Sequence, residues 1–251
     1  MVNMSKCDLI IFDIDGTLTR SKSLIDKEMV GLICQLLEKY KVAIISGAGY
    51  GQFQWQILDQ LSCPQELLKK LYLLPVDGTV MCFDEGSWRC EADEELSEQE
   101  KSEIRKAFDQ ALEKTGISKP EKIEGDLVED RGSQMNFSAL GQKAAVEPKE
   151  KWDPDNSKRI RIVEILKELL PNFAFHIGGT TSIEVTRPGV DKAYGLRKFS
   201  QSSGITFDKM LYFGDKLFEG GNDAPVLTLG IECLAVKGPE ETKVAIRELL
   251  E

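Results

Sequence analysis

The chain has 251 residues, of which 41% are hydrophobic and 8% aromatic, so it can bury a sizeable core in one large domain or two modest ones. Its formal net charge is −10, and neither a basic run nor a basic face is evident. This charge argues against nucleic acid or an anionic membrane surface as a partner. An anionic substrate would have to be bound by local cationic groups and a metal ion.

The N-terminal residues lead almost at once into an apolar strand, and no apolar stretch approaches the roughly 20 residues that a membrane span needs. We therefore predict a cytoplasmic protein.

The six cysteines lack the Cys-x-x-Cys spacing of zinc sites, so we expect buried, reduced thiols rather than zinc ligands or disulfides. The cysteines are Cys7, Cys34, Cys63, Cys82, Cys90 and Cys233.

The stretch 8–20, DLIIFDIDGTLTR, carries the strongest local signal. Residues 9–12 form an apolar run typical of a strand buried on both faces, and the run ends in Asp13 and Asp15. Because side chains alternate along a strand, the two carboxylates should leave it on the same side and repel each other unless a cation lies between them or one of them holds a proton. Mg²⁺ prefers such oxygen ligands. The alternative is a solvated Asp/Gly turn after a strand.

Residues 25–45 predict a helix followed by a second buried strand. Such a unit implies a parallel strand pair, whose ligands lie beyond the carboxyl ends of the strands. Ser46 falls at that edge, where its hydroxyl could donate to a phosphoryl oxygen, and the backbone N–H groups from Gly47 onward could approach an anion. Ser46 could instead cap the next helix.

A further helix is predicted at residues 53–61 and a strand at 71–76, which ends in a second Asp-Gly-Thr sequence. This sequence lacks the preceding carboxylate, so we interpret residues 77–79 as a turn. From Val80 the pattern changes to a hairpin and then a long charged helix at about 97–114.

The next part of the chain predicts an α+β layer, a sheet with two helices on one face. Its remaining parts are a strand pair at 128–140, a polar connection at 143–157, a helix at 160–170 and a hairpin at 173–185. We expect this layer to be inserted into the first fold from about Val80 to Pro188.

After the insertion, a helix is predicted at 191–203 and a strand at 210–213, which ends in Gly214 and Asp215. Asp215 gives the edge of the sheet a third carboxylate and is the best candidate to complete a Mg²⁺ site with Asp13. Residues 220–223 form a polar turn, and we expect Asp223 to orient Lys192 or a metal-bound water. A last strand and a last helix follow at 231–236 and 240–250.

Four motifs in this order resemble those of the haloacid dehalogenase (HAD) superfamily of phosphoryl-transfer enzymes. They are residues 13–17, Ser46-Gly47, Lys192, and Gly214-Asp215 with Asn222-Asp223. The resemblance is closest to the eukaryotic-type phosphomannomutases, because residues 213–223 share their long spacing between acidic residues. It implies an α/β, Rossmann-like parallel-sheet core at 1–79 and 189–251, with an inserted α+β cap at 80–188 that sets substrate specificity.

The resemblance also implies a mechanism. Asp13 would attack phosphorus to form an aspartyl phosphate, and Asp15 would protonate the leaving oxygen and later take a proton from water or a hydroxyl. Lys192 and Mg²⁺ would neutralise the phosphate oxygens. The alternative from another class is a catalytically silent sugar-phosphate-binding protein with the same fold.

The resemblance implies that the metal is held by Asp13, Asp215 and the backbone carbonyl of Asp15, with Asn222 and Asp223 behind these ligands. It further implies a phosphorylated sugar as substrate and a possible homodimer formed through the cap. We expect hinges near residues 77–78 and 188–189 that let the cap close and exclude water.

Residues of the expected cap indicate which of two reactions, hydrolysis or phosphomutase transfer, the protein catalyses. Arg131 and Asn136 stand where phosphomannomutases hold the distal phosphate of a bisphosphorylated sugar, but two further arginine positions carry Gln142 and Lys149. Lys22, a candidate substrate-binding residue near Asp13, also replaces an arginine. A lysine lacks the planar fork of arginine, and a glutamine lacks its charge. Since a mutase must retain its bisphosphate intermediate, we favour a sugar-phosphate phosphatase, with hexose phosphomutase as the alternative.

Overall fold

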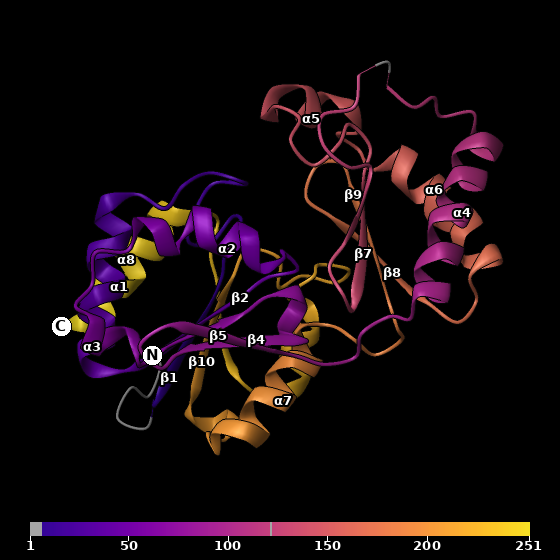
Figure 1. Ribbon diagram of the computed structural model, residues 1–251. Helices are drawn as coiled ribbons and strands as arrows, with labels where there is room; N and C mark the ends of the chain where they lie inside the picture. Colours follow the sequence, from indigo (N-terminus) through magenta and orange to yellow (C-terminus); the bar gives the residue numbers. More distant parts are fainter. Residues whose placement is uncertain (1–6, 121) are drawn as a thin grey trace. The chain divides into compact units, whose positions relative to one another are not determined.

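The computed structural model describes residues 7–120 and 122–251, which divide into two compact units (Figure 1). The core unit is Met1–Ala92 with Asp191–Glu251, and the cap unit is Asp93–Val190. Residues 1–6 of the N-terminal lead discussed above lie outside the described residues. Among the helices that are described, none combines the length and apolar composition needed to cross a bilayer.

The core unit is built on a seven-stranded sheet in the order β11-β10-β1-β2-β3-β4-β5. The first five strands in this order are parallel, and β4 and β5 continue the sheet as an antiparallel hairpin. The strands are β1 (Leu9–Asp13), β2 (Lys41–Ile45), β3 (Leu71–Leu74), β4 (Val80–Asp84), β5 (Trp88–Ala92), β10 (Met210–Gly214) and β11 (Glu232–Ala235).

Helices cover both faces of this sheet (Figure 1). They are α1 (Lys27–Lys39), α2 (Tyr50–Gln56), α3 (Gln65–Leu68), α7 (Lys192–Ser203) and α8 (Pro239–Leu250), with 3₁₀ turns at Leu58–Gln60, Val76–Gly78, Phe207–Lys209 and Ala224–Leu229. Side chains of α1 and α8 belong to the cluster on one face, and those of α7 belong to the cluster on the other. Every residue of β1 is buried, which confirms the prediction of a strand covered on both faces.

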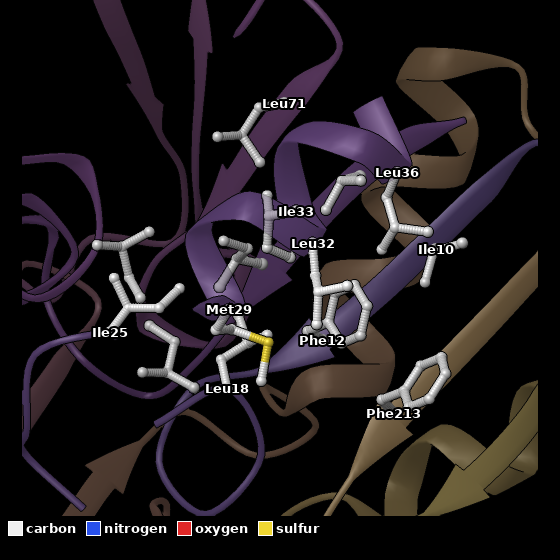
Figure 2. Close-up of a cluster of buried hydrophobic side chains, with 14 of the residues drawn as sticks. Ile10, Phe12, Leu18, Ile25, Met29, Leu32, Ile33, Leu36, Leu71 and Phe213 are labelled. Atoms are coloured by element: carbon white, nitrogen blue, oxygen red, sulfur yellow. The ribbon is translucent and has the colours of Figure 1, made fainter. Parts of the chain in front are cut away.

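Figure 2 shows the cluster under α1, where Ile10 and Phe12 of β1 lie near Phe213 of β10. The Phe12 and Phe213 rings stack with their centroids 4.8 Å apart. Because β1 is hydrogen-bonded to β2 on one side and to β10 on the other, its carboxyl end is held within the sheet. Asp13, its last residue, therefore has a fixed position.

The cap unit is a four-stranded antiparallel sheet with helices on one face. The strands, in sheet order, are β6 (Val128–Asp130), β7 (Gln134–Ser138), β9 (Ser182–Thr186) and β8 (Ala174–Gly178). Two long helices, α4 (Glu98–Thr115) and α6 (Ser157–Leu169), share one apolar cluster with the sheet. Ser97 begins α4 through a capping box with Glu100. The fold is thus the α/β core with an α+β cap that the sequence predicts.

Two details differ from the sequence-based expectations. The hairpin expected at the start of the cap forms, but β4 and β5 pair with β3 in the core sheet, so the two units divide after Ala92 rather than at Val80. The connection expected to be irregular at 143–157 contains a short helix, α5 (Val146–Trp152). Its polar composition hides it from a search for apolar periodicity.

The expectation of reduced thiols is wrong for four cysteines. Cys34 and Cys63 form one disulfide, and Cys82 and Cys90 form another. Cys82 and Cys90 are register partners on β4 and β5, which is a pairing that the linear sequence does not reveal. Cys7 and Cys233 are free. Because disulfides are rare in the reducing cytosol, these bonds do not favour the cytoplasmic location predicted from the sequence.

Candidate active site

The carboxyl ends of β1 and β10 bring three carboxylates together. Asp13 is the last residue of β1, and Asp215 directly follows β10, its parallel neighbour. Asp223, from the loop after β10, completes the group, and one carboxylate oxygen from each residue lies within 4.8 Å of the others. The structure thus brings together Asp13 and Asp215, which the sequence assigns to one site.

A lysine lies among these carboxylates. The Lys192 side chain, at the start of α7, is buried and donates hydrogen bonds of 2.6 Å to Oδ1 of both Asp13 and Asp223. The preceding Asp191 caps α7 by accepting from the backbone N–H of Tyr194 at 2.8 Å. The cap fixes the first turn of α7 and with it the backbone position of Lys192.

Tyr212 is a member of this group that the sequence analysis missed. It is fully buried on β10, its hydroxyl donates to Asp223 Oδ1 at 2.5 Å, and Lys192 Nζ lies 3.4 Å from the same hydroxyl. Asp223 Oδ2 also accepts from the backbone N–H of Lys216 at 2.9 Å. A tyrosine in an apolar strand is usually assigned to the core, so only its contact with Asp223 reveals its polar role.

Burial and charge shift the pKa values of these groups in different directions. Burial raises the pKa of the Asp13 carboxyl to about 7, against the opposing effect of Lys192, and it also raises the pKa of Asp215. Burial disfavours the Lys192 ammonium, but Asp13 and Asp223 outweigh it and hold its pKa well above the ordinary value. Burial likewise opposes ionisation of Asp223, yet Lys192 lowers the pKa of Asp223. Lys216 also acts on Asp215, so two ammonium groups face three carboxylates and leave their negative charge incompletely neutralised.

The donor set fits a hard divalent cation. The three carboxylates offer oxygen ligands, and Asp215 Oδ1 is buried without a hydrogen-bond partner among the described residues. Two further buried oxygens of the same kind, Thr17 Oγ1 and Asn222 Oδ1, belong to the segments that follow the same two strands. Buried polar atoms without partners are costly, and a cation with its bound waters would satisfy oxygens of this kind.

Asp15 lies beyond the end of β1, where it forms a bridge with Thr19, so strand alternation does not extend to it, and it is not among the carboxylates that cluster with Asp13. The Asp15 carboxylate instead accepts from Gln56 Nε2 at 2.9 Å, from Gln52 Nε2 at 3.3 Å and from the backbone N–H of Lys22 at 2.7 Å. Gln52 and Gln56 lie one turn apart on α2, and the sequence analysis missed both. These bonds hold the Asp15 carboxylate in one orientation.

Glycine is required at two positions because a carboxylate lies close to the backbone there. Gly16 has φ +96°, and a Cβ there would lie 2.4 Å from Asp215 Oδ2. At Gly214, a Cβ would lie 2.6 Å from Asp223 Oδ2. Any larger residue at either position would displace a carboxylate of the cluster.

Ser46 follows β2 at the same edge of the sheet, next to the residue paired with Asp13. Its Oγ accepts from the backbone N–H of Ala48 at 3.2 Å, and its carbonyl accepts from the backbone N–H of Asp77 at 2.9 Å. Helix α2 has Gly49 at its N-cap, so Ser46 does not cap it.

The second Asp-Gly-Thr sequence, residues 77–79, forms the predicted turn, with Asp77 at φ +55°.

The candidate cap residues gather around β7 in the cap unit. Arg131 donates to Glu129 and to Gln134 Oε1, and Asn136 is 1% exposed. Gln142 Nε2 donates to the backbone carbonyl of Asn136 at 3.3 Å. The structure thus brings Arg131, Asn136 and the replaced arginine position at Gln142 to one region of the cap sheet.

Comparisons with known proteins agree with this architecture. A family model described as eukaryotic phosphomannomutase matches residues 29–251. Phosphomannomutase 2 of Dictyostelium discoideum is 26% identical over 254 residues, covering 98% of each chain. Human phosphomannomutase 1 is 27% identical over 256 residues, covering 96% of this chain and 91% of its own.

Solved structures share the fold at lower identity. The IMP-bound IMP-nucleotidase of Plasmodium falciparum, solved as a mutant, has a TM-score of 0.74 at 19% identity, over 99% of this chain and 68% of its own. A haloacid dehalogenase-like hydrolase of Bacteroides thetaiotaomicron has a TM-score of 0.64 at 15% identity, over 97% of this chain and 100% of its own.

Proposed function

The chain belongs to the eukaryotic phosphomannomutase family of the haloacid dehalogenase superfamily and is a phosphoryl-transfer enzyme, and from this premise we propose that it is a Mg²⁺-dependent sugar-phosphate phosphatase. The observation that carries the proposal is the buried contact of Lys192 with Asp13, 2.6 Å long, inside a cluster of three carboxylates. This arrangement combines a nucleophile with the positive charge that a phosphate ester requires.

In the proposed reaction, an Asp13 oxygen forms a bond to phosphorus while the bond from phosphorus to the ester oxygen breaks. Asp15, held by Gln52 and Gln56, gives a proton to the leaving oxygen. Asp15 then takes a proton from water, which attacks the aspartyl phosphate and releases inorganic phosphate. Lys192 stabilises the charge on the phosphoryl oxygens throughout.

Mg²⁺ would be held by the carboxylates of Asp13 and Asp215 and by the backbone carbonyl of Asp15, and it would supply positive charge next to the transferred phosphate. Asn222 and Asp223 would support this site from behind, with Asp223 directing Lys192 through their 2.6 Å bond. Ser46 would donate its hydroxyl to a phosphoryl oxygen, the Gly47 backbone N–H would bind the same group, and Lys22 would bind the substrate near Asp13.

We prefer hydrolysis to mutase chemistry because the cap lacks two of the arginines that would hold a second phosphate. Losing an arginine fork to phosphate removes roughly 1.5–3 kcal/mol, which is about tenfold to a hundredfold in retention of a bisphosphate intermediate. Gln142 and Lys149 stand at two such positions. The second candidate, a hexose phosphomutase, is favoured by the family match and by Arg131 with Asn136.

The deciding experiment is ³¹P NMR on mannose 1-phosphate with Mg²⁺ and catalytic glucose 1,6-bisphosphate. Free phosphate alone supports the phosphatase. Mannose 6-phosphate that forms ahead of free phosphate would replace the proposal with the mutase. A panel of aryl and sugar phosphates together with IMP, which is bound in one structural neighbour, tests the remaining alternative. Release from none of these esters would indicate a silent binding protein.

The homodimer through the cap and the cytoplasmic location remain predictions. Light scattering of the purified chain tests the first. Mass spectrometry of thiol-blocked protein tests whether the disulfides Cys34–Cys63 and Cys82–Cys90 persist in the cell. Reduced cysteines in freshly blocked cells would support a cytoplasmic location.

A further inference from the structure

A cavity of about 250 Å³ lies in the core unit, between the end of α7 and strands β3, β4 and β5. Tyr72 on β3 is the register partner of Phe83 on β4, and Met81 on β4 is the partner of Glu91 on β5. Register partners share a face, and Met81 and Phe83 are two residues apart, so all four side chains lie on one face of the sheet. Across from them, the Phe199 ring of α7 meets the Tyr72 ring edge-on, with centroids 5.0 Å apart.

The cavity is separate from the carboxylate cluster. Lys192 begins α7, whereas Ser202 and Ser203, the last two residues of this helix, line the cavity. At 1.5 Å per residue, the two ends of α7 are roughly 16 Å apart. None of the lining residues belongs to the group of Asp13, Asp215 and Asp223. The walls are open to a ligand, since Tyr72, Met81 and Phe83 are only partly buried.

The charge at the cavity is negative. Glu91 is the one carboxylate in its lining, and no lysine, arginine or histidine of the described residues lines it. In the part of the chain that the structure describes, the Glu91 carboxylate forms neither an ion pair nor a hydrogen bond. The arginine on the same face of the hairpin, Arg89, is paired with Glu85 at 3.2 Å. Glu91 is therefore available to a cation that enters the cavity.

The end of α7 adds to this negative potential. The last carbonyl groups of a helix carry partial negative charge, which favours a cation beside them. The last turn of α7 contains no basic residue. Ser202 Oγ donates to the Phe199 carbonyl at 3.1 Å, but a hydroxyl adds no net charge. The helix end therefore lacks a cation of its own.

A disulfide fixes the strand that carries Glu91. Cys82 and Cys90 are bonded to each other and stand in register next to the pair of Met81 and Glu91. This bond holds β5 against β4 and limits the movement of Glu91 relative to the apolar wall. A site that is ordered before its ligand arrives loses less conformational freedom on binding.

A small organic ammonium ion has the chemistry that matches these features. Its positive charge is attracted by the aromatic rings and by Glu91, and its methyl or methylene groups pack against the rings and the Met81 thioether. An anion would be repelled by Glu91 and by the end of α7. A neutral apolar molecule could fit the walls but would gain nothing from the charge.

We propose that this cavity binds a small organic ammonium ion, such as a methylated amine, with aromatic rings in contact with the cation and Glu91 as its counter-ion. The inference goes beyond the phosphatase function and does not depend on it, because the cavity contains no residue of the catalytic centre. Binding can therefore be measured whether or not the chain hydrolyses any ester.

The test uses NMR of the full chain with ¹³C-labelled methionine methyl groups, one of which is that of Met81. The probes are choline chloride and 3,3-dimethyl-1-butanol, which has the same shape with a neutral carbon in place of the nitrogen, at equal ionic strength. Met81→Leu assigns the Met81 signal. We expect choline to move this signal and to bind at least about fivefold more tightly than the alcohol. Equal affinity for the two probes, or no movement of the Met81 signal with choline, would overturn the inference.

Two variants test the roles of charge and ring. Glu91→Gln should weaken choline binding about threefold and leave the alcohol unaffected, since the carboxylate is exposed. Glu232→Gln is the matched control, because Glu232 is an exposed glutamate on β11, at the opposite edge of the same sheet. Phe83→Leu keeps an apolar side chain and should weaken choline binding about fivefold. Unchanged amide spectra confirm that each variant is folded.

The variants can also contradict the inference. An equal loss of choline affinity in Glu91→Gln and Glu232→Gln would mean that the overall charge of the protein, rather than this cavity, attracts the cation. Choline affinity that is unchanged in both Glu91→Gln and Phe83→Leu would reject the site.

Discussion

The core and cap units both bury polar groups, but they balance charge in opposite ways. In the core, Lys192 pairs with Asp13 and Asp223, and Lys216 acts on Asp215, so the three carboxylates carry more negative charge than these two ammonium groups compensate. In the cap, Arg131 is paired with Glu129, and the buried Arg159 is paired with Asp153, both nearly inaccessible. The unbalanced group suits a cation and a reacting phosphate, whereas Arg131 and Arg159 of the cap each already have a carboxylate partner.

The two units can in this way have different roles, with the reaction in the core and the discrimination between ligands in the cap. Uncompensated negative charge is unfavourable for folding, but it supplies the carboxylate that attacks phosphorus and the oxygens that bind a metal ion. Neutral hydrogen-bonding groups contribute little to a reaction but discriminate between ligands that differ by one hydroxyl or one charge. Four variants or conditions test this division, in order of expected effect.

Removing the nucleophile should have the largest effect. Asp13→Asn should lower phosphate release from an aryl phosphate by at least about a thousandfold, because the side chain can no longer bond to phosphorus. EDTA should reproduce the loss in the wild-type enzyme, and added Mg²⁺ should restore activity there but not in the variant. The cap should keep its fold, which near-ultraviolet circular dichroism can check. Activity within tenfold of wild type would mean that another residue attacks.

Removing one member of the Arg159–Asp153 ion pair should let the cap unfold at a lower denaturant concentration. Arg159→Met leaves Asp153 buried without its partner and removes the bonds to the carbonyls of Gly178 and Gly179, at a cost of about 3–5 kcal/mol. Urea titration followed by Trp152 fluorescence measures the change in the unfolding free energy. Arg161→Met is the control, since Arg161 is an exposed residue that donates to Thr115 O at 2.8 Å. Equal losses in the two variants would show that the buried pair has no special role.

Removing the Tyr212 hydroxyl tests how the core uses its surplus charge. Tyr212→Phe deletes the bond of 2.5 Å to Asp223, so Asp223 holds Lys192 less firmly. We expect kcat to fall about tenfold with little change in KM, consistent with about 1.5 kcal/mol for a hydrogen bond to a charged group. Tyr72→Phe, which alters a ring packed edge-on against Phe199, should leave kcat unchanged. A rise in KM without a fall in kcat would assign Tyr212 to substrate binding instead.

The smallest effect concerns pH. Hydrogen bonds from Arg187, and then from Ser97, lower the pKa of Glu100 in the cap from 4.5 to about 2. Because the folded-state pKa is the lower one, Glu100 stabilises the cap above about pH 4.5 and loses that contribution as the pH falls toward 2. Asp13 has the opposite sign, since its raised pKa favours the folded core at low pH and loses that contribution as the pH rises through about 7.

Thermal unfolding between pH 6 and pH 3 should therefore show a loss of cap stability that Glu100→Gln reduces. Glu103→Gln on the same helix is the control, because Glu103 accepts from Gln99 at an exposed position. The same slope in both variants would show that Glu100 is not responsible.

The parts of the fold that follow from local pattern could be predicted from the sequence. The apolar run before Asp13 predicted β1, and the placement of Asp215 after a second such run predicted its meeting with Asp13, since parallel strands end at one edge. The alternation used to place Asp15 on the same side as Asp13 does not apply, because β1 ends at Asp13. Strand ends are the least certain part of such predictions.

The remaining features depend on contacts between distant segments. In sequence, Tyr212 resembles a core residue and Gln56 an ordinary polar helix residue. They become part of the site only when the loop carrying Asp223 and the turn carrying Asp15 fold against them. The disulfide between Cys34 and Cys63 joins residues 29 positions apart, with no spacing motif to predict it. On β7, Gln134 Nε2 and Asn136 Oδ1 are buried without hydrogen-bond partners among the described residues, which the polar sequence of this strand does not reveal.

The order of the core strands also has a consequence for the timing of synthesis. β1 pairs with β10 from Leu9 and Met210 onward, so one neighbour of the central strand is made roughly 200 residues after it. At about 5–20 residues per second, the ribosome takes on the order of 10–40 s to supply it. Throughout that interval one edge of β1 lacks its partner, and exposed strand edges invite aggregation. The nascent chain therefore depends on protection of that edge, and it acquires a complete catalytic centre only after translation has passed Asp223.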